Sequence, residues 1–169
     1  KDRGLKKYTE HIKTIIVEKD EDMAVKYYEM AATYDYAPAY LEGQVVEELG
    51  GGVCQVSTTL YNAIFGAGLT TTYRKSHTFE PAYITPGLDA TVSGTWPDYK
   101  FKNQYNYPIY ISSSVKGNYV TVDIWSNENA LEGKTFEPYS VKRNGGYASY
   151  LKVYLDGKKI EEKYLGMSY

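Results

Sequence analysis

Cysteine and histidine are scarce in this chain of 169 residues, which contains one cysteine and two histidines. A single cysteine excludes an internal disulfide, and one cysteine with two distant histidines is a poor set of zinc ligands. CxxC, HExxH and GxSxG patterns are absent, and the triple glycine lacks the lysine of a phosphate-binding loop. The sequence therefore predicts neither a metal site nor a cofactor.

A surplus of charge and a long apolar run are also missing. The formal net charge is −2 and the isoelectric point is about 5.8, so a nucleic-acid partner, which needs a basic face, is not expected. No stretch reaches the roughly 18 apolar residues of a membrane helix, and no signal peptide is present. Because the chain starts at Lys1, we expect a fragment whose membrane anchor or export signal lies upstream.

Tyrosine is the residue that is unusually abundant, with 20 copies. Most of them are expected on half-buried sheet surfaces, although a tyrosine ring and hydroxyl also suit extended ligands such as glycans or peptides. The length predicts a single domain over residues 1–169 with one core.

Two helices are predicted in the N-terminal half. The first begins at Asp20, has an apolar face spaced at 3.6 residues per turn, and ends before Pro38. The second runs from about Gln55 to Ala67 and ends at Gly68 as its C-terminal cap. Its expected buried stripe consists of Val56, Leu60, Ala63, Ile64 and Ala67.

Short β segments separated by turn signals account for most of the remaining chain. A strand is expected at 9–17, a hairpin at 39–49 turning near Glu42-Gly43, and strands at 107–111 and 118–125. A closing hairpin is expected from residues 147–154 and 159–164, joined at Asp156-Gly157. The predicted class is α+β, with the two helices packed on a mostly antiparallel sheet.

The only cysteine lies in the run GGGVCQVSTTLYNA, residues 50–63. Glycines let the backbone turn tightly, and the N-terminus of the following helix favours a thiolate. Cys54 is therefore predicted to be a nucleophile. Backbone N–H groups from Gly52 to Gln55 are expected to bind an oxyanion, while Gly51 and Gly52 leave room for substrate. The alternative is that Cys54 is a buried small hydrophobic residue.

A cysteine nucleophile needs a base, and His77 is the stronger of the two candidates. It lies in the polar segment RKSHTF, residues 74–79, directly after the chain returns from the cysteine helix. His11 lies in the expected apolar strand and is predicted to be structural or exposed. Asp89, Asp98 or a backbone carbonyl could orient the His77 ring.

Two basic residues beside His77 are candidates for substrate binding. Arg74 and Lys75 are placed to bind a substrate carboxylate, for which arginine offers a bidentate contact. Two cations on a loop are also commonly just solvated.

The motifs GGGVCQVSTTLYNA, RKSHTF, PGLDATV (86–92) and DYKFKNQYNYPIYI (98–111) together resemble the VanW family of bacterial envelope proteins. That family takes its name from an accessory gene of vancomycin-resistance clusters. The resemblance is strongest over residues 36–125, and residues 126–169 resemble the C-terminal β-hairpin tail of the same domain. Residues 1–35 lack the arginine- and asparagine-containing helix and the Pro-Gly-Glu/Phe-Ser-Phe stretch of other members.

What the resemblance implies is peptidoglycan chemistry. Some clostridial members act as L,D-transpeptidases, which make 3→3 cross-links between stem peptides through a cysteine acyl-enzyme and release D-alanine. On this basis Cys54 matches the nucleophile and His77 the general base. From the residues themselves, Asp89 is kept as the third catalytic candidate, and substrate binding is expected at Gly51, Gly52, Gln55, Arg74 and Ser76.

The resemblance also implies stem peptides as partners and an extracytoplasmic location on the wall side of the membrane, with the domain itself not embedded. Two alternatives come from other functional classes. One is a non-catalytic peptidoglycan-binding module whose surface tyrosines hold glycan or peptide, and the other is an envelope scaffold.

Overall fold

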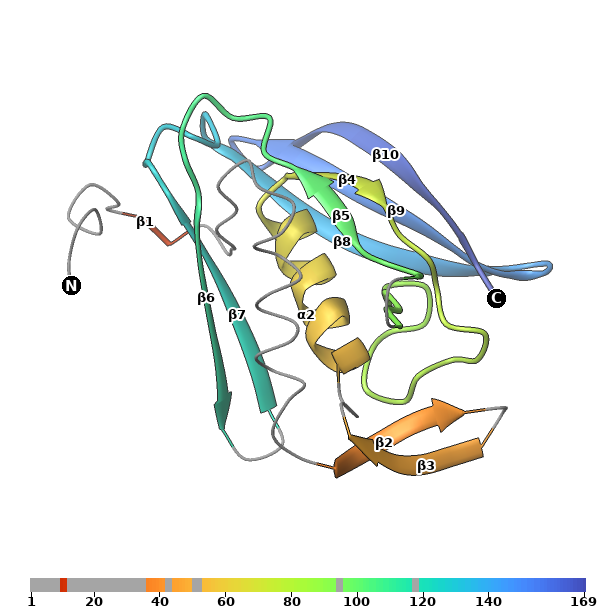
Figure 1. The fold of residues 1–169 in the computed structure, drawn as a ribbon. Coiled ribbons are helices and arrows are strands. Elements are labelled where there is room, and N and C mark those ends of the chain that lie inside the picture. Colours follow the sequence, from red (N-terminus) through yellow and green to blue (C-terminus); the bar gives the residue numbers. More distant parts are fainter. Residues whose placement is uncertain (1–9, 12–35, 42–43, 50–52, 94–95, 117–118) are drawn as a thin grey trace, which may run out of the picture.

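The computed structural model describes residues 10–11, 36–41, 44–49, 53–93, 96–116 and 119–169. These residues form one helix and ten strands (Figure 1). In chain order the elements are β1 (Glu10–His11), β2 (Tyr36–Leu41), β3 (Gln44–Leu49), α2 (Val53–Gly66), β4 (Thr70–Tyr73), β5 (Lys100–Lys102), β6 (Tyr110–Lys116), β7 (Tyr119–Ser126), β8 (Lys134–Arg143), β9 (Gly146–Leu155) and β10 (Lys158–Ser168).

The prediction of an α+β fold with two helices packed on a sheet is wrong. The described residues contain only α2, and strands dominate. Tyr36 and Ala37, which should have closed the first helix, open β2 instead and pair with Leu49 and Glu48 of β3. Cross-strand pairing supplies hydrogen bonds and side-chain contacts that override a local helical periodicity. The remainder of that expected helix lies outside the described residues.

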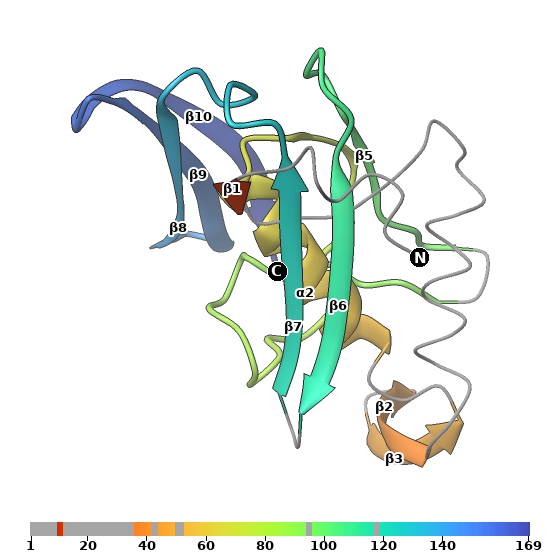
Figure 2. The same ribbon diagram turned by 90° about the vertical axis from the view of Figure 1, so that its left-hand side faces the viewer.

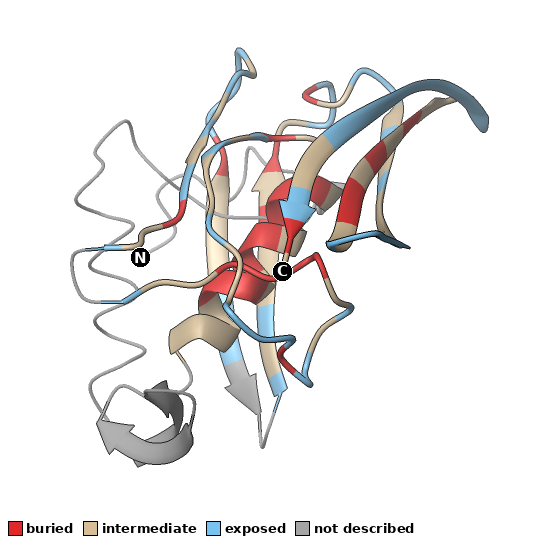
Figure 3. Ribbon diagram, turned by 90° about the vertical axis from the view of Figure 1, so that its right-hand side faces the viewer, coloured by how far each residue is buried: buried red, intermediate tan, exposed pale blue. Residues whose placement is uncertain are grey.

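Helix α2 lies at the centre of the domain. The β6–β7 hairpin covers one side of it, the sheet of order β10-β9-β8 another, and the β4–β5 pair lies beside its C-terminal half (Figures 1 and 2). The buried residues gather on α2 and on the surfaces that contact it (Figure 3). The core includes the predicted stripe members Leu60, Ala63, Ile64 and Ala67, while Val56 is partly buried against it.

The C-terminal end of α2 confirms the predicted glycine cap. Gly68 has a φ of +64°, its N–H donates to the carbonyl of Phe65, and the N–H of Leu69 donates to the carbonyl of Ile64. This pair of bonds is a Schellman motif, and the buried side chains of Leu69 and Ile64 accompany it. The helix therefore ends where a left-handed residue is required, and the chain turns directly into β4.

The hairpins predicted at 39–49 and 147–164 are confirmed. Strands β2 and β3 pair antiparallel from Tyr36–Leu49 to Leu41–Gln44, and β9 pairs with β10 across the Asp156-Gly157 turn. The strand expected at 107–111 begins only at Tyr110 and continues to Lys116 as β6, and its pairing with β7 was not predicted. In β7 the residues Val120 and Val122 are half-buried and Ile124 is buried, while Tyr119 and Thr121 on the other face are exposed. Of the strand expected at 9–17, β1 pairs with β7, and the rest lies outside the described residues.

Candidate active site

Cys54 lies in the first turn of α2, which starts at Val53. The N–H groups of a first helical turn have no partners within the helix, and the helix dipole adds positive potential there. The sulfur is partly buried and lies 3.3 Å from the carbonyl oxygen of Val92 and 3.5 Å from the hydroxyl of Thr91. The thiol therefore faces a distant segment of chain, which carries the other polar groups of the site.

That segment belongs to the long connection between β4 and β5, and buried side chains of α2 hold it in place. The Thr58 hydroxyl accepts from the Ala90 N–H at 3.0 Å, and it also lies 3.2 Å from the Ala90 carbonyl. The Ser57 hydroxyl donates to the same carbonyl at 2.5 Å, and the Asn62 amide donates to Leu88. Because Ser57 and Thr58 are buried and Asn62 is half-buried, these bonds fix residues 88–90 against the helix.

Two stretches of this connection also contact each other. The Thr91 N–H donates to the carbonyl of Lys75 at 2.9 Å. This bond brings the segment that contains His77 next to the segment that contains Asp89, and both next to the first turn of α2.

His77 and Asp89 form a short, buried pair. The ring nitrogen Nδ1 lies 2.7 Å from Asp89 Oδ2, and the backbone N–H of His77 donates to the same oxygen at 2.7 Å. The Asp89 side chain is 0% exposed and that of His77 is 8% exposed. With Nδ1 engaged by the carboxylate, Nε2 is the nitrogen left for the thiol, and the Tyr83 hydroxyl lies 3.5 Å from it.

The electrostatics of the site favour an ion pair between Cys54 and His77. Burial raises the pKa of the Cys54 thiol, but hydrogen bonds with the His77 ring and the Thr91 hydroxyl outweigh it and leave the pKa below its ordinary value. Burial lowers the pKa of His77, but hydrogen bonds with Asp89 and Cys54 raise it to about 9. Burial raises the pKa of Asp89, and its hydrogen bonds with His77 bring the pKa below the ordinary value.

Arg74 is placed differently from the prediction that it binds a substrate carboxylate. Its Nη2 lies 2.9 Å from Asp89 Oδ1, and its Nε donates to the Asp89 carbonyl at 2.6 Å. It also donates to the carbonyl of Gly87 and to the hydroxyl of Ser168. The side chain is 8% exposed, so the guanidinium is used inside the protein to hold Asp89.

The other predicted site residues fall into three groups. Gly51 and Gly52 lie outside the described residues. Gln55 follows Cys54 in the first turn of α2, and Ser76 precedes His77 and is half-buried, so both lie beside the reactive pair in sequence. Asp98, the rival to Asp89, accepts the N–H of Tyr99. The group that contacts His77 Nδ1 is Asp89.

Two further candidates remain. The Lys75 side chain is exposed, and its backbone carbonyl accepts the Thr91 N–H. His11 pairs with Trp125 in the β1–β7 ladder. Within the described residues no group of three or more His, Cys, Asp or Glu side chains is gathered to hold a metal ion. Among these residues there is also no helix with the length and apolar character needed to span a membrane.

Sequence reasoning missed the residues that hold the site together. Thr91 and Val92, which contact the sulfur, stand two and three residues after Asp89 in the motif PGLDATV, so their position was visible but their role was not. Ser57 and Thr58 lie outside the apolar stripe predicted for this helix, yet both are buried and bind the Ala90 carbonyl. Nothing in the local sequence indicates Ser168, because its contact with Arg74 spans 94 residues.

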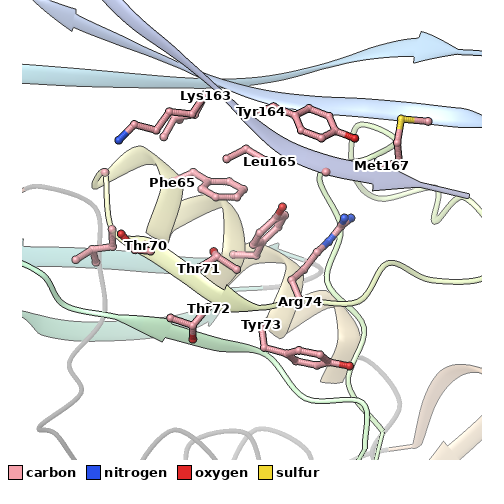
Figure 4. A pocket seen from close by; sticks show the side chains of 15 residues that line it. Phe65, Thr70, Thr71, Thr72, Tyr73, Arg74, Lys163, Tyr164, Leu165 and Met167 are labelled. Carbon is pink, nitrogen blue, oxygen red and sulfur yellow. The ribbon is translucent and has the colours of Figure 1, made fainter.

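A groove of about 400 Å³ lies beside the site (Figure 4). Residues of β4 and β10 line it from two sides, with Phe65 of α2 between these strands, and Tyr61 of α2 also lines it. Arg74 and Met167 both line this groove, so the largely buried Arg74 side chain borders a space that opens to solvent.

The fold and the site define a β-rich domain around one central helix. A cysteine at the start of this helix lies beside a histidine, and an aspartate binds the other side of the histidine ring. The family described as VanW like protein matches residues 2–125, and the chain belongs to this family. It is also similar to a protein of Bacillus subtilis (strain 168) described as "Uncharacterized protein YoaR", with 45% identity over 95 residues. That match covers 56% of this chain and 31% of the relative, so the chain spans about a third of the relative's length. No solved structure matches the chain significantly.

Proposed function

We propose that this domain is a cysteine-dependent L,D-transpeptidase of the bacterial cell wall. The observation that carries the proposal is the line of contacts from Cys54 through His77 to Asp89, with the sulfur at the start of a helix and the carboxylate fully buried behind the ring. A packing cysteine requires none of these partners. Each of them helps a nucleophile that must be a thiolate near neutral pH.

The first half of the reaction forms an acyl-enzyme. The Cys54 thiolate attacks the carbonyl carbon between the L-centre of diaminopimelate and the terminal D-alanine of a tetrapeptide stem. The oxyanion that forms is bound by backbone N–H groups at the start of α2, where Gln55 follows the nucleophile. The His77 imidazolium then gives its Nε2 proton to the departing amine, D-alanine leaves, and a thioester remains on Cys54.

The second half transfers the acyl group. The side-chain amine of a second stem attacks the thioester carbonyl, and neutral His77 takes the proton that this amine loses. Collapse of the tetrahedral intermediate breaks the carbon–sulfur bond, so a 3→3 cross-link forms and the thiolate–imidazolium pair is restored. If water replaces the amine, the same steps make the domain an L,D-carboxypeptidase.

Membership of the VanW family supports a cell-wall setting for this chemistry. The substrates in this proposal are the stem peptides of peptidoglycan, which places the working domain outside the cytoplasm, on the wall side of the membrane. Asp89 orients the base, and Arg74 acts behind Asp89 rather than on the substrate.

The test is incubation of the purified domain with disaccharide-tetrapeptide muropeptides, followed by mass analysis of cross-linked dimers and measurement of free D-alanine. Cys54→Ala should abolish both products while the circular dichroism spectrum stays unchanged. Dimer formation by Cys54→Ala equal to that of the wild type would end the proposal. If the wild type binds muropeptides without converting them, the domain is a binding module instead.

The two histidines provide a matched comparison in the same assay. His77→Ala should reduce turnover by about 10²–10⁴-fold, the usual cost of removing a general acid or base. His11→Ala should retain turnover, because His11 belongs to the β1–β7 pairing. A similar loss in both variants would remove His77 from the chemistry.

A further inference from the structure

The family match ends at residue 125, yet the C-terminal sheet beyond it makes polar contacts with the loop that carries Asp89. The Ser149 hydroxyl donates to the Gly87 carbonyl at 2.6 Å, and the Ser140 hydroxyl donates to the Pro86 carbonyl at 2.5 Å. Ser168, at the end of β10, accepts from Arg74 Nη1 at 2.8 Å. Strands β8, β9 and β10 therefore each contribute one serine to the surroundings of Asp89.

The packing at this contact leaves little freedom. Gly87 has a φ of +88°, and a Cβ there would lie 3.0 Å from Ser149 Oγ and 3.0 Å from Tyr147 Cβ. Ser149 and Ser168 are buried. The loop backbone thus approaches the sheet closely, and its carbonyls have protein donors in place of water.

Arg74 joins the two parts. Its guanidinium binds Oδ1 and the backbone carbonyl of Asp89 on one side and Ser168 on the other, and it lies 5.1 Å from the centre of the Tyr61 ring. The planar guanidinium has N–H donors that point in several directions and can make these contacts at the same time, whereas a lysine ammonium is a single compact charge that cannot reach them all.

We propose that Arg74 is a positioning residue for the Cys54–His77–Asp89 set, and that the C-terminal sheet holds Arg74 in place through Ser168. Arg74 touches neither the thiol nor its base. It fixes the rotamer of Asp89 through Oδ1, so that Oδ2 stays aimed at His77. A role of Arg74 in catalysis rests on the proposed function. Its effect on the reactivity of the Cys54 thiol does not, and it can be measured without a substrate.

The test is the pH dependence of Cys54 alkylation by iodoacetamide, which needs no muropeptide. Arg74→Lys keeps the positive charge but loses the simultaneous contacts of the guanidinium with Asp89 and Ser168. Asp89 should then hold His77 less well, the pKa of the Cys54 thiol should rise, and alkylation at pH 6 should slow by about tenfold. Ser168→Ala should shift the curve in the same direction by less. Arg143→Lys, a change at an exposed arginine of β8, serves as the control and should match the wild type.

Chemical rescue separates geometry from charge. In Arg74→Ala, methylguanidinium can reach the vacated space from the groove between β4 and β10 and should restore alkylation at pH 6, while methylammonium should not. An unchanged alkylation curve in a folded Arg74→Lys protein would overturn the inference, as would equal rescue by both cations. If Arg74→Lys does not fold, the test passes to Ser168→Ala. A wild-type pH dependence of Cys54 alkylation in that variant would then refute the inference. A wild type that alkylates rapidly but releases no D-alanine would refute the proposed function alone.

Discussion

Replacing Asp89 with asparagine removes the negative charge behind His77 while preserving the size of the side chain. Both carboxylate oxygens act as acceptors in the folded protein. Oδ2 accepts from the backbone N–H of His77 and contacts its Nδ1, and Oδ1 accepts from Arg74. An asparagine has one oxygen and one NH₂ group, so whichever way it turns, the NH₂ faces a donor from Arg74 or from His77. The variant therefore loses both the charge and one satisfied contact.

The size of the effect follows from the pKa of His77. Burial lowers that pKa, yet hydrogen bonds with Asp89 and Cys54 raise it from 6.5 to about 9, which corresponds to about 3 kcal/mol in favour of the imidazolium. Without the carboxylate the pKa of His77 should fall, and the pKa of the Cys54 thiol should rise because its counter-ion is lost. Alkylation at pH 6 should slow by about 10–100-fold, and D-alanine release should fall by about 10²–10⁴-fold.

The assay is paired iodoacetamide kinetics and D-alanine release, both measured per folded molecule from pH 5 to pH 10. Asp98→Asn is the matched control, because Asp98 lies in the same connection but contacts the N–H of Tyr99. Wild-type alkylation and turnover in Asp89→Asn would refute the reasoning. Equal losses in both variants would show that the effect comes from the loop as a whole.

Three further predictions concern pH and stability. The pKa of His77 is raised to about 9, so its contribution to stability is complete below pH 6.5 and is lost as the pH rises through about 9. The lowered pKa of Cys54 contributes in the opposite direction, so the two contributions offset each other in the wild type. In Cys54→Ala the His77 contribution stands alone, so calorimetry should show a melting temperature that falls as the pH rises above 6.5, and a Cys54→Ala/His77→Gln protein with the same slope would contradict this. Thr58→Val removes a buried hydroxyl that accepts the Ala90 N–H, so urea unfolding should show a free energy of unfolding lower by about 1–3 kcal/mol. Thr72→Val, at an exposed position of β4, is the control and should leave that free energy almost unchanged. Gly68→Ala forces a left-handed φ on alanine and places its Cβ against the Phe136 ring, so it should lower the free energy of unfolding by about 1–3 kcal/mol. Full wild-type stability would count against the cap.

Local sequence signals located the elements that depend on local physics. The apolar stripe of α2 and its closing glycine were visible because helical periodicity and a left-handed cap involve residues within five positions of one another. The Asp156-Gly157 turn and the β9–β10 hairpin were visible for the same reason. The first predicted helix failed at Tyr36 because pairing with β3 decides the structure of those residues. A helical spacing of apolar residues does not report on a partner strand.

The reactive pair was partly visible in the sequence. The sequence predicts Cys54 as the nucleophile, because it follows three glycines at a helix start. It predicts His77 as the base, because this histidine lies in the polar segment after that helix. The choice between Asp89 and Asp98 was not visible, because both are carboxylates on the same connection. The structure distinguishes them, since Thr58 and Ser57 hold Ala90 on the helix and so place Asp89 2.7 Å from the ring.

The helix that carries the thiol follows from the amino-acid sequence alone, because helix start, stripe and cap are local properties of residues 53–68. The contacts of Arg74 depend on the folded chain. A free guanidinium on a loop suits a substrate carboxylate, but burial between Asp89 and Ser168 uses its donors internally, since a buried charge must be paired and hydrogen-bonded. That pairing joins residues 94 positions apart, a distance over which sequence pattern carries no information about contact.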